Sequence, residues 1–238
     1  MYYRGDIRFK GVSSNTYGLI VTEPPRVTHS EVKGDTYQIP YRNGDLHSSE
    51  TYRGDAQISV KMAFVKSSIT NYVSTIRQIR KWLTGTGSLV IADSEDAYYE
   101  VKKVNITTEN RIIATYGVLE VTFTVHPYEF LTSGNTAINT SSISNPNSPS
   151  EPLYMITGTA NAEGTLNVNG NTMSFKIPTG GTLYIDTRRM IAYGSDNINA
   201  NDKVSGDYRK LLLKSGSNTV SVTSGFILYT YPKWGYEI

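Results

Sequence analysis

The chain has 238 residues, a formal net charge of +2 and no cysteine. Its length allows a sizeable core in one or two domains, and the missing cysteines exclude disulfides, thiolate nucleophiles and cysteine metal ligands. The small net charge argues against a basic nucleic-acid-binding module. Residues 1–10 lack the apolar stretch of a signal peptide, and no run of about eighteen apolar residues occurs, so we expect a soluble protein made in the cytoplasm, without a membrane anchor.

The first half reads as strands around one helix. Residues 7–9 and 19–21 are short apolar segments, and Pro24 and Pro25 end the second of them. In residues 58–64 and 119–125 large apolar side chains alternate with polar ones, or with Ala63 in the first segment. This period of two is typical of strands with one buried face, so these are the two strongest strand predictions.

Residues 24–52 predict a long hairpin or arm. Short extended pieces there are separated by the turn sequences Lys-Gly-Asp at 33–35 and Asn-Gly-Asp at 43–45, and Arg-Gly-Asp follows at 53–55. Each of these glycines can supply the positive φ of a tight turn. The Arg-Gly-Asp tripeptides at 4–6 and 53–55 are therefore interpreted as turn-forming rather than receptor-binding.

One helix is expected over about 68–83. Either Ser67 or Ser68 can cap it, the last turns are basic, and Gly85 can supply a left-handed stop. After it, strands at 89–92 and 98–101 flank an acidic tip at 93–96, and a further strand is expected around 104–108. The apolar stripe of the helix consists of Ile69, Tyr72, Val73, Ile76, Ile79 and Leu83.

A polar segment, residues 132–152, holds one charged residue, Glu151, and three prolines. This composition predicts a hinge between a first domain, 1–131, and a second, 153–238. In the second domain Asn169-Gly170 predicts a tight hairpin, and short strands follow at 183–185, 190–193, 219–222 and 226–231. Their regular spacing favours an antiparallel sandwich without a helix.

No convincing catalytic, metal or cofactor site can be assembled from the sequence. The three histidines are far apart, the acidic tip lacks the spacing of a calcium loop, and Gly85-Thr86-Gly87 precedes a strand rather than a helix. Asp186 and Asp207 illustrate the many carboxylate pairs that such a chain offers to a glycosidase interpretation. We therefore expect no enzyme and no cofactor. The histidines are His29, His47 and His126.

Several segments resemble one family. Residues 9–14, 17–21 and 39–46 are similar to the opening of the distal tail proteins, called Dit, of long non-contractile-tailed bacteriophages, or siphophages. Residues 152–158, 166–170, 184–186 and 212–222 resemble later parts of the same family. The resemblance covers nearly the whole chain and consists of strand and turn patterns.

The resemblance implies a mainly β fold with two domains: a tail-tube-like β-sandwich with one helix, and a galectin-like or carbohydrate-module-like antiparallel sandwich. It implies a hexameric ring around a DNA channel at the distal end of the phage tail. The ring would join the major tail protein of the tube to the tail-associated hub protein and anchor receptor-binding or baseplate proteins. Synthesis would take place in the bacterial host cytoplasm, and no sequence-specific nucleic acid binding is implied.

A ring needs two different complementary surfaces on each subunit, and an extended arm supplies one of them. The arm at 24–52 is thus the expected ring contact. Its candidate interface residues are Pro24, Pro25, Tyr37, Tyr41, Arg42, Asp45 and Tyr52.

Two other functions are considered. A carbohydrate-binding module would need aromatic rings on one sheet face, although residues 153–238 contain no histidine and Trp234 as their single tryptophan, unlike the sugar-binding set of galectins. A glycan-degrading enzyme would have unpaired acids alone to rely on. The candidate sugar-stacking residues are Tyr184, Tyr193, Tyr208, Tyr229 and Tyr231.

Overall fold

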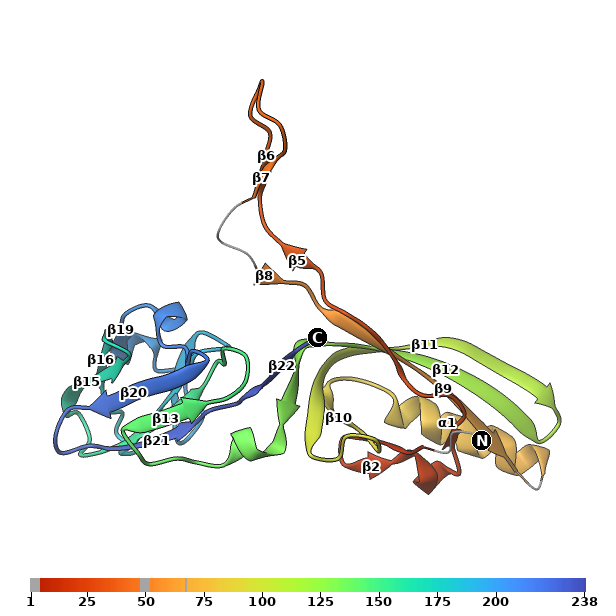
Figure 1. The fold of residues 1–238 in the computed structure, drawn as a ribbon. Helices are drawn as coiled ribbons and strands as arrows, with labels where there is room; N and C mark the ends of the chain where they lie inside the picture. Colours follow the sequence, from red (N-terminus) through yellow and green to blue (C-terminus); the bar gives the residue numbers. More distant parts are fainter. Residues whose placement is uncertain (1–4, 48–51, 67) are drawn as a thin grey trace. The chain divides into compact units, whose positions relative to one another are not determined.

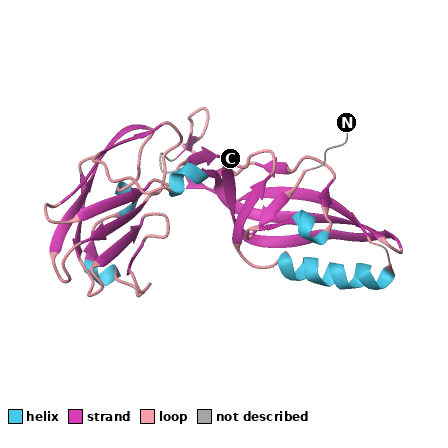
Figure 2. Cartoon of the chain, turned by 90° about the horizontal axis from the view of Figure 1, so that it is seen from below, coloured by secondary structure: helices cyan, strands magenta, loops and turns pink. Residues whose placement is uncertain are grey.

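Two compact units make up the chain in a computed structural model, which describes residues 5–47, 52–66 and 68–238 (Figures 1 and 2). Unit 1 comprises residues 1–129 together with 237–238, and unit 2 comprises 130–236. Arg4 and Ser67, which belong to a predicted turn and a predicted cap, lie outside the described residues.

Unit 1 is built on one antiparallel sheet in the order β2-β1-β10-β11-β12-β9-β3, with β4 paired to β9 and β22 paired to β12. Gly5, just before β1, bridges to Val21 in β3, which brings the two ends of this order together. The strands are β1 (Ile7–Phe9), β2 (Val12–Ser13), β3 (Ile20–Val21), β4 (Arg26–Thr28), β9 (Ala56–Val65), β10 (Gly87–Ile91), β11 (Ala97–Ile113), β12 (Tyr116–Leu131) and β22 (Gly235–Glu237), with the 3-10 turn η1 (Ser14–Tyr17).

The two strongest predicted strands are confirmed, and the structure shows that they are neighbours. In the register of β9 and β12, Val60 lies opposite Val121 and Met62 opposite Leu119, and all four side chains are fully buried. The alternating residues Ser59, Lys61 and Glu120 point to the other face. Alternation in the sequence therefore fixes which face of the sheet meets the core.

The predicted helix is α1 (Ile69–Trp82), and Ser68 caps it by accepting a hydrogen bond from the Asn71 amide. Figure 2 shows it lying along the strands of unit 1. The predicted apolar stripe was wrong at its start, because Ile69 is half exposed. Trp82 is buried instead, with its indole Nε1 donating to the Phe9 carbonyl over 3.0 Å.

The strand prediction beyond the acidic tip was wrong in one respect, because β11 (Ala97–Ile113) is a single long strand. The tip at 93–96 is a turn between β10 and β11, as predicted, but the expected separate strands at 98–101 and 104–108 form one strand of 17 residues. β11 is hydrogen-bonded to β12, and this pairing overrides the weak strand tendency of its polar residues.

The predicted arm forms a long hairpin between β4 and β9. Its strands are β5 (Val32–Lys33), β6 (Thr36–Tyr37), β7 (Leu46–His47) and β8 (Tyr52–Arg53), with β5 paired to β8 and β6 paired to β7. In Figure 1 these strands continue beyond β9 as one extended ribbon.

Unit 2 has two antiparallel sheets with one shared core and no α-helix. One sheet has the order β13-β20-β15-β16-β19 and the other β18-β17-β14-β21, and the core cluster draws residues from both, as in a sandwich. The strands are β13 (Ser142–Asn145), β14 (Leu153–Thr157), β15 (Glu163–Val168), β16 (Asn171–Lys176), β17 (Thr182–Asp186), β18 (Ile191–Gly194), β19 (Val204–Ser205), β20 (Gly216–Val222) and β21 (Ile227–Tyr231), with the 3-10 turns η2 (Thr132–Asn135), η3 (Asn201–Lys203) and η4 (Tyr208–Lys210).

The predicted Asn169-Gly170 turn joins β15 to β16. Both residues have positive φ, 51° and 85°, which matches a primed two-residue hairpin turn. The register pairs Val168 with Asn171 and Leu166 with Met173, so the apolar residues of both strands enter the core together.

The structure differs from the expected domain boundaries. Residues 132–152 belong to unit 2, where they contain η2 and β13 and bury Asn145, Asn147 and Ser150. Asn145 is hydrogen-bonded within the segment: its side chain donates to the Ser148 carbonyl and accepts from the Asn147 amide, both over 3.0 Å. A polar composition therefore marks a hydrogen-bonded strand and its turns rather than a separate hinge. Residues 237–238 also depart from the expected division, since they belong to unit 1.

Candidate assembly surfaces

The arm carries apolar side chains that the rest of unit 1 does not cover. Every described residue from Glu31 to His47 is exposed, and Tyr41, at a positive φ of 66°, is exposed over its whole surface. A concentration of exposed apolar groups on one element is typical of an interaction surface. The exposed apolar residues are Val32, Tyr37, Ile39, Tyr41, Leu46 and Tyr52.

The outer half of the arm has two different faces. Tyr37 pairs with Leu46 across the hairpin, while Thr36 pairs with His47 and lies 3.2 Å from its Nδ1. Cross-strand partners project from the same face, so one face is apolar and the other polar. We call the pair Tyr37 and Leu46 the apolar arm face.

The seven predicted interface residues fall into two groups. Pro24 and Pro25 precede β4 at the sheet, whereas the other five lie on the arm or at its tip and are exposed. Three further exposed apolar residues of the arm were not among the seven: Val32, Ile39 and Leu46. The arm group consists of Tyr37, Tyr41, Arg42, Asp45 and Tyr52.

Residues 237–238 hold the base of the arm. The Ser30 amide donates to the Ile238 carbonyl over 3.0 Å, and the Ile238 amide donates to the Pro127 carbonyl of β12 over 3.1 Å. Arg53, on the returning strand of the arm, donates to the Glu237 carboxylate from Nε over 2.8 Å. The second Arg-Gly-Asp tripeptide is thus part of a structural contact, and Asp55 likewise pairs with Lys102 at 2.5 Å.

Unit 2 presents a second surface on the outer side of the sheet β18-β17-β14-β21. Tyr193 lies opposite Tyr184, Tyr184 opposite Met155, and Met155 opposite Tyr229, in one row across four strands. The rings of Tyr184 and Tyr193 stack at 5.1 Å, and burial, followed by the nearby Asp186 carboxylate, raises the pKa of Tyr193. Together with Leu153 and Tyr231, which pair in the next row, these residues form the tyrosine face.

Four of the five predicted sugar-stacking tyrosines therefore share one sheet face. Tyr208 does not, since it lies in η4 and its hydroxyl donates to Asn201 Oδ1 over 3.2 Å. All four tyrosines of the face are half-buried rather than fully exposed. An antiparallel sheet turned to solvent usually carries polar side chains, so this row is unusual in composition.

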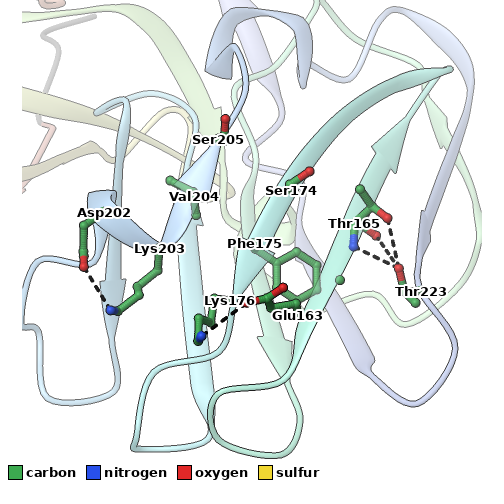
Figure 3. A pocket seen from close by; sticks show the side chains of 11 residues that line it. Glu163, Thr165, Ser174, Phe175, Lys176, Asp202, Lys203, Val204, Ser205 and Thr223 are labelled. Carbon is green, nitrogen blue, oxygen red and sulfur yellow. Dashed lines mark hydrogen bonds and ion pairs between the residues drawn. The ribbon is translucent and has the colours of Figure 1, made fainter.

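The other sheet of unit 2 carries a polar groove of about 600 Å³, drawn in Figure 3. Across it Thr165 pairs with Ser174, and Ser174 with Ser205. Its charged residues are already paired, Lys176 with Glu163 at 3.2 Å and Lys203 with Asp202 at 3.0 Å. The groove was not predicted, because it arises from strands whose pairing the sequence does not specify.

Asp186 and Asp207, the carboxylates that could suggest glycan cleavage, both have structural partners. Asp186 accepts from the Arg189 amide, and Asp207 caps η4 and accepts from the Arg209 guanidinium. The hydrogen bonds from Arg209 lower the pKa of Asp207, so it does not suit a general acid. Among the described residues no group of three or more potential ligands is placed to hold a metal ion, and no described helix has the length and hydrophobicity of a membrane span.

Comparison with known proteins gives a clear result at the level of structure. The crystal structure of SPP1 Dit (gp 19.1), described as a paradigm of the hub adsorption apparatus in phages that infect Gram-positive bacteria, superimposes with a TM-score of 0.68. The match covers 96% of this chain and 98% of that one, at 13% sequence identity. The chain has the Dit fold.

Two structures of the phage p2 baseplate in its activated conformation, with Sr and with Ca, also match the Dit fold of this chain. Their TM-scores are 0.54 and 0.50, each at 10% identity with 95% of this chain and 97% of that chain covered. No family model and no curated protein sequence matches. The resemblance expected from the strand and turn patterns is thus confirmed in the structure.

Proposed function

We propose that this chain is a structural hub protein of the distal tail of a siphophage. The observation that carries the proposal is the superposition on SPP1 Dit over nearly the full length of both chains. Alignment over both units argues for a shared architecture rather than one common domain. In this proposal six copies form a ring with a central channel for DNA, and the chain has no enzymatic role.

The partners follow from the same proposal. The ring joins the major tail protein of the tube to the tail-associated hub protein, with receptor-binding or baseplate proteins attached to it. The protein is then a virion component at the end of the tail, and the galectin-like assignment of unit 2 belongs to the proposal as well. Its two antiparallel sheets around one core support that assignment.

The arm is the proposed contact between neighbouring subunits. A closed ring requires that two different patches of the same chain fit each other. The apolar arm face, Tyr37 with Leu46, is exposed in the single chain, so its apolar surface area could be buried on association. Burying it on the next subunit would remove that surface from water.

Light scattering after size-exclusion chromatography, followed by negative-stain imaging, tests this. We expect a six-fold ring of about 160 kDa, six times the 26.4 kDa of the chain. Leu46→Asp should shift the protein toward monomers, because it puts a charge in the contact. Ile227→Asp, at an exposed apolar residue of unit 2, is the matched control and should leave the ring intact. Monomers both alone and with the tail-tube protein would contradict the hexamer.

A second candidate function is glycan binding by unit 2, favoured by the four tyrosines on one sheet face. Co-sedimentation with purified host cell walls tests it. Binding that is lost in Tyr184→Ala and kept in Tyr208→Ala would support a carbohydrate-binding role, since Tyr208 lies off the face. Equal binding by both variants, or none by the wild-type chain, would exclude the tyrosine face as the sugar site.

A further inference from the structure

The base of the arm is fastened on both of its strands by the same two residues. On the outgoing strand, the Ser30 amide and hydroxyl both donate to the Ile238 carbonyl. On the returning strand, Arg53 donates to one carboxylate oxygen of Glu237 from Nε, at 2.8 Å, and from Nη2, at 2.5 Å. Residues 237–238 therefore contact both strands of the hairpin at the level where it leaves the sheet.

These residues are themselves fixed in unit 1. Ile238 is 9% exposed and belongs to the core cluster, and its amide is bonded to Pro127 of β12. Tyr128 Oη lies 3.5 Å from the second oxygen of Glu237. The side chains of Arg53 and Glu237 are only about one-third exposed, at 31% and 33%, so their attraction is less screened than at an open surface. The contact thus connects the arm to the core of unit 1.

We propose that Glu237 and Ile238 form a clamp that sets the direction in which the arm leaves the sheet, with Glu237 as a positioning residue for the ring contact. The lever is long. From Ser30 to Tyr41 an extended strand covers roughly 35 Å at about 3.3 Å per residue, so a rotation of about 10° at the base moves the tip by roughly 6 Å. A displacement of this size is enough to separate the apolar arm face from a neighbouring subunit.

The clamp would also strengthen the proposed ring contact. An arm that is already directed loses less conformational freedom when it docks, and this saving appears as tighter association. The proposal rests on the proposed function of the arm as the ring contact. The clamp itself, however, is a property of the single chain and is testable without the ring.

Distances between two spin labels test the clamp directly. The chain has no cysteine, so Asp45→Cys at the arm tip and Lys103→Cys on β11 give two unique labelling sites. Labelled protein is diluted in unlabelled protein so that only distances within one chain are measured. We expect Glu237→Gln, which keeps the shape and removes the charge, to widen the distance distribution roughly twofold.

Two further variants make the result specific. Glu163→Gln breaks an ion pair with Lys176 in unit 2 and should leave the distribution unchanged. Exchange of the charges, Arg53→Glu with Glu237→Arg, should narrow the distribution again. Thermal melts of each variant identify any general loss of folding. An unchanged distribution in Glu237→Gln, or equal widening in Glu163→Gln, would overturn the clamp.

Ring assembly is then measured separately. If the clamp positions the ring contact, Glu237→Gln should need a roughly fivefold higher protein concentration for half-assembly. A widened distance distribution with unchanged assembly would support the clamp and count against the arm as the ring contact. A normal distribution with no ring in any variant would count against the clamp and the hexamer independently.

Discussion

At the scale of single residues, the packing of α1 against the sheet depends on Gly117, which has no Cβ atom. A Cβ atom at Gly117 in β12 would lie 2.4 Å from the Tyr72 hydroxyl and 2.9 Å from its Cε2. Tyr72 has little freedom to move, because its ring stacks on Phe64 at 4.9 Å and Arg111 lies over it at 5.1 Å. The glycine is therefore needed for close approach of helix and sheet.

Gly117→Ala should accordingly destabilise unit 1 by about 1–3 kcal/mol, the usual cost of overpacking. Gly54→Ala is the matched control: its nearest neighbour is Cε of Lys33, near the end of a flexible side chain at 3.3 Å, so it should cost less. Urea unfolding followed by Trp82 fluorescence measures both. Equal costs at the two positions would show that Tyr72 moves aside.

The buried hydroxyl of Tyr154 should make the free energy of unfolding of unit 2 depend on pH. Its buried hydroxyl donates to the Leu211 carbonyl over 2.8 Å, and burial raises its pKa far above the usual value near 10. A raised pKa means that this contribution to stability is complete below about pH 10 and is lost as the pH rises further. Tyr154→Phe should cost about 1–2 kcal/mol at neutral pH because the carbonyl loses this donor. It should also weaken the fall in stability above pH 10, which urea titrations at several pH values measure.

At the scale of elements, the sequence predicted those features that depend on residues close together in the chain. The alternation in β9 and β12, the Ser68 cap and the Asn169-Gly170 turn all act through neighbours in sequence, and each is confirmed. The exposure of Ile69 and the burial of Trp82 depend instead on what the helix meets, namely Phe9 and Tyr17. Such partners are distant in sequence, so periodicity alone does not reveal them.

The same limit applies to the candidate surfaces. Turn residues predicted the arm, but its fastening joins Ser30 and Arg53 to residues about 200 positions away. The row of Tyr193, Tyr184 and Tyr229 was predicted as a composition, while its arrangement on one face required the strand order. Residue types were thus readable from the sequence, and their long-range pairing was not.

The hairpin turn at Gly170 gives an element-scale prediction. Gly170 has φ 85°, and no atom lies within 4 Å of an added Cβ, so a substitution meets backbone strain alone. Gly170→Val should destabilise unit 2 by about 1–2 kcal/mol, whereas Gly170→Asn should cost clearly less because asparagine tolerates the left-handed region. Thermal unfolding followed by Trp234 fluorescence compares them. A similar loss for both would point to contacts rather than strain.

At the scale of the whole molecule, two separate cores each contain one of the two tryptophans. Trp82 belongs to the core cluster of unit 1, and Trp234 packs against that of unit 2. Trp82→Phe and Trp234→Phe variants thus give one reporter for each unit. The cores are independent clusters, so we treat the unfolding of each unit as its own transition.

Ile238→Ala tests the unexpected assignment of the last two residues to unit 1. Removing a buried aliphatic side chain should cost about 2–4 kcal/mol. The loss should appear in the Trp82 signal and leave the Trp234 signal unchanged, although residue 238 lies only four positions beyond Trp234. A shift of the Trp234 transition instead would contradict the division of the chain. Chemical unfolding of the two single-tryptophan proteins measures it.

The return of residues 237–238 to unit 1 has a consequence for biosynthesis. All of unit 2 is translated between β12 and these two residues, so the first unit stays incomplete while the second emerges and folds. Domains generally fold in the order of synthesis, from the N-terminus. In this chain synthesis of unit 1 begins first, but unit 1 is complete only when residues 237–238 have been made. These residues contact the base of the arm, so the arm is fastened only after unit 2 has been synthesised. Nascent chains are therefore expected to carry an unfastened arm until residues 237–238 have been made.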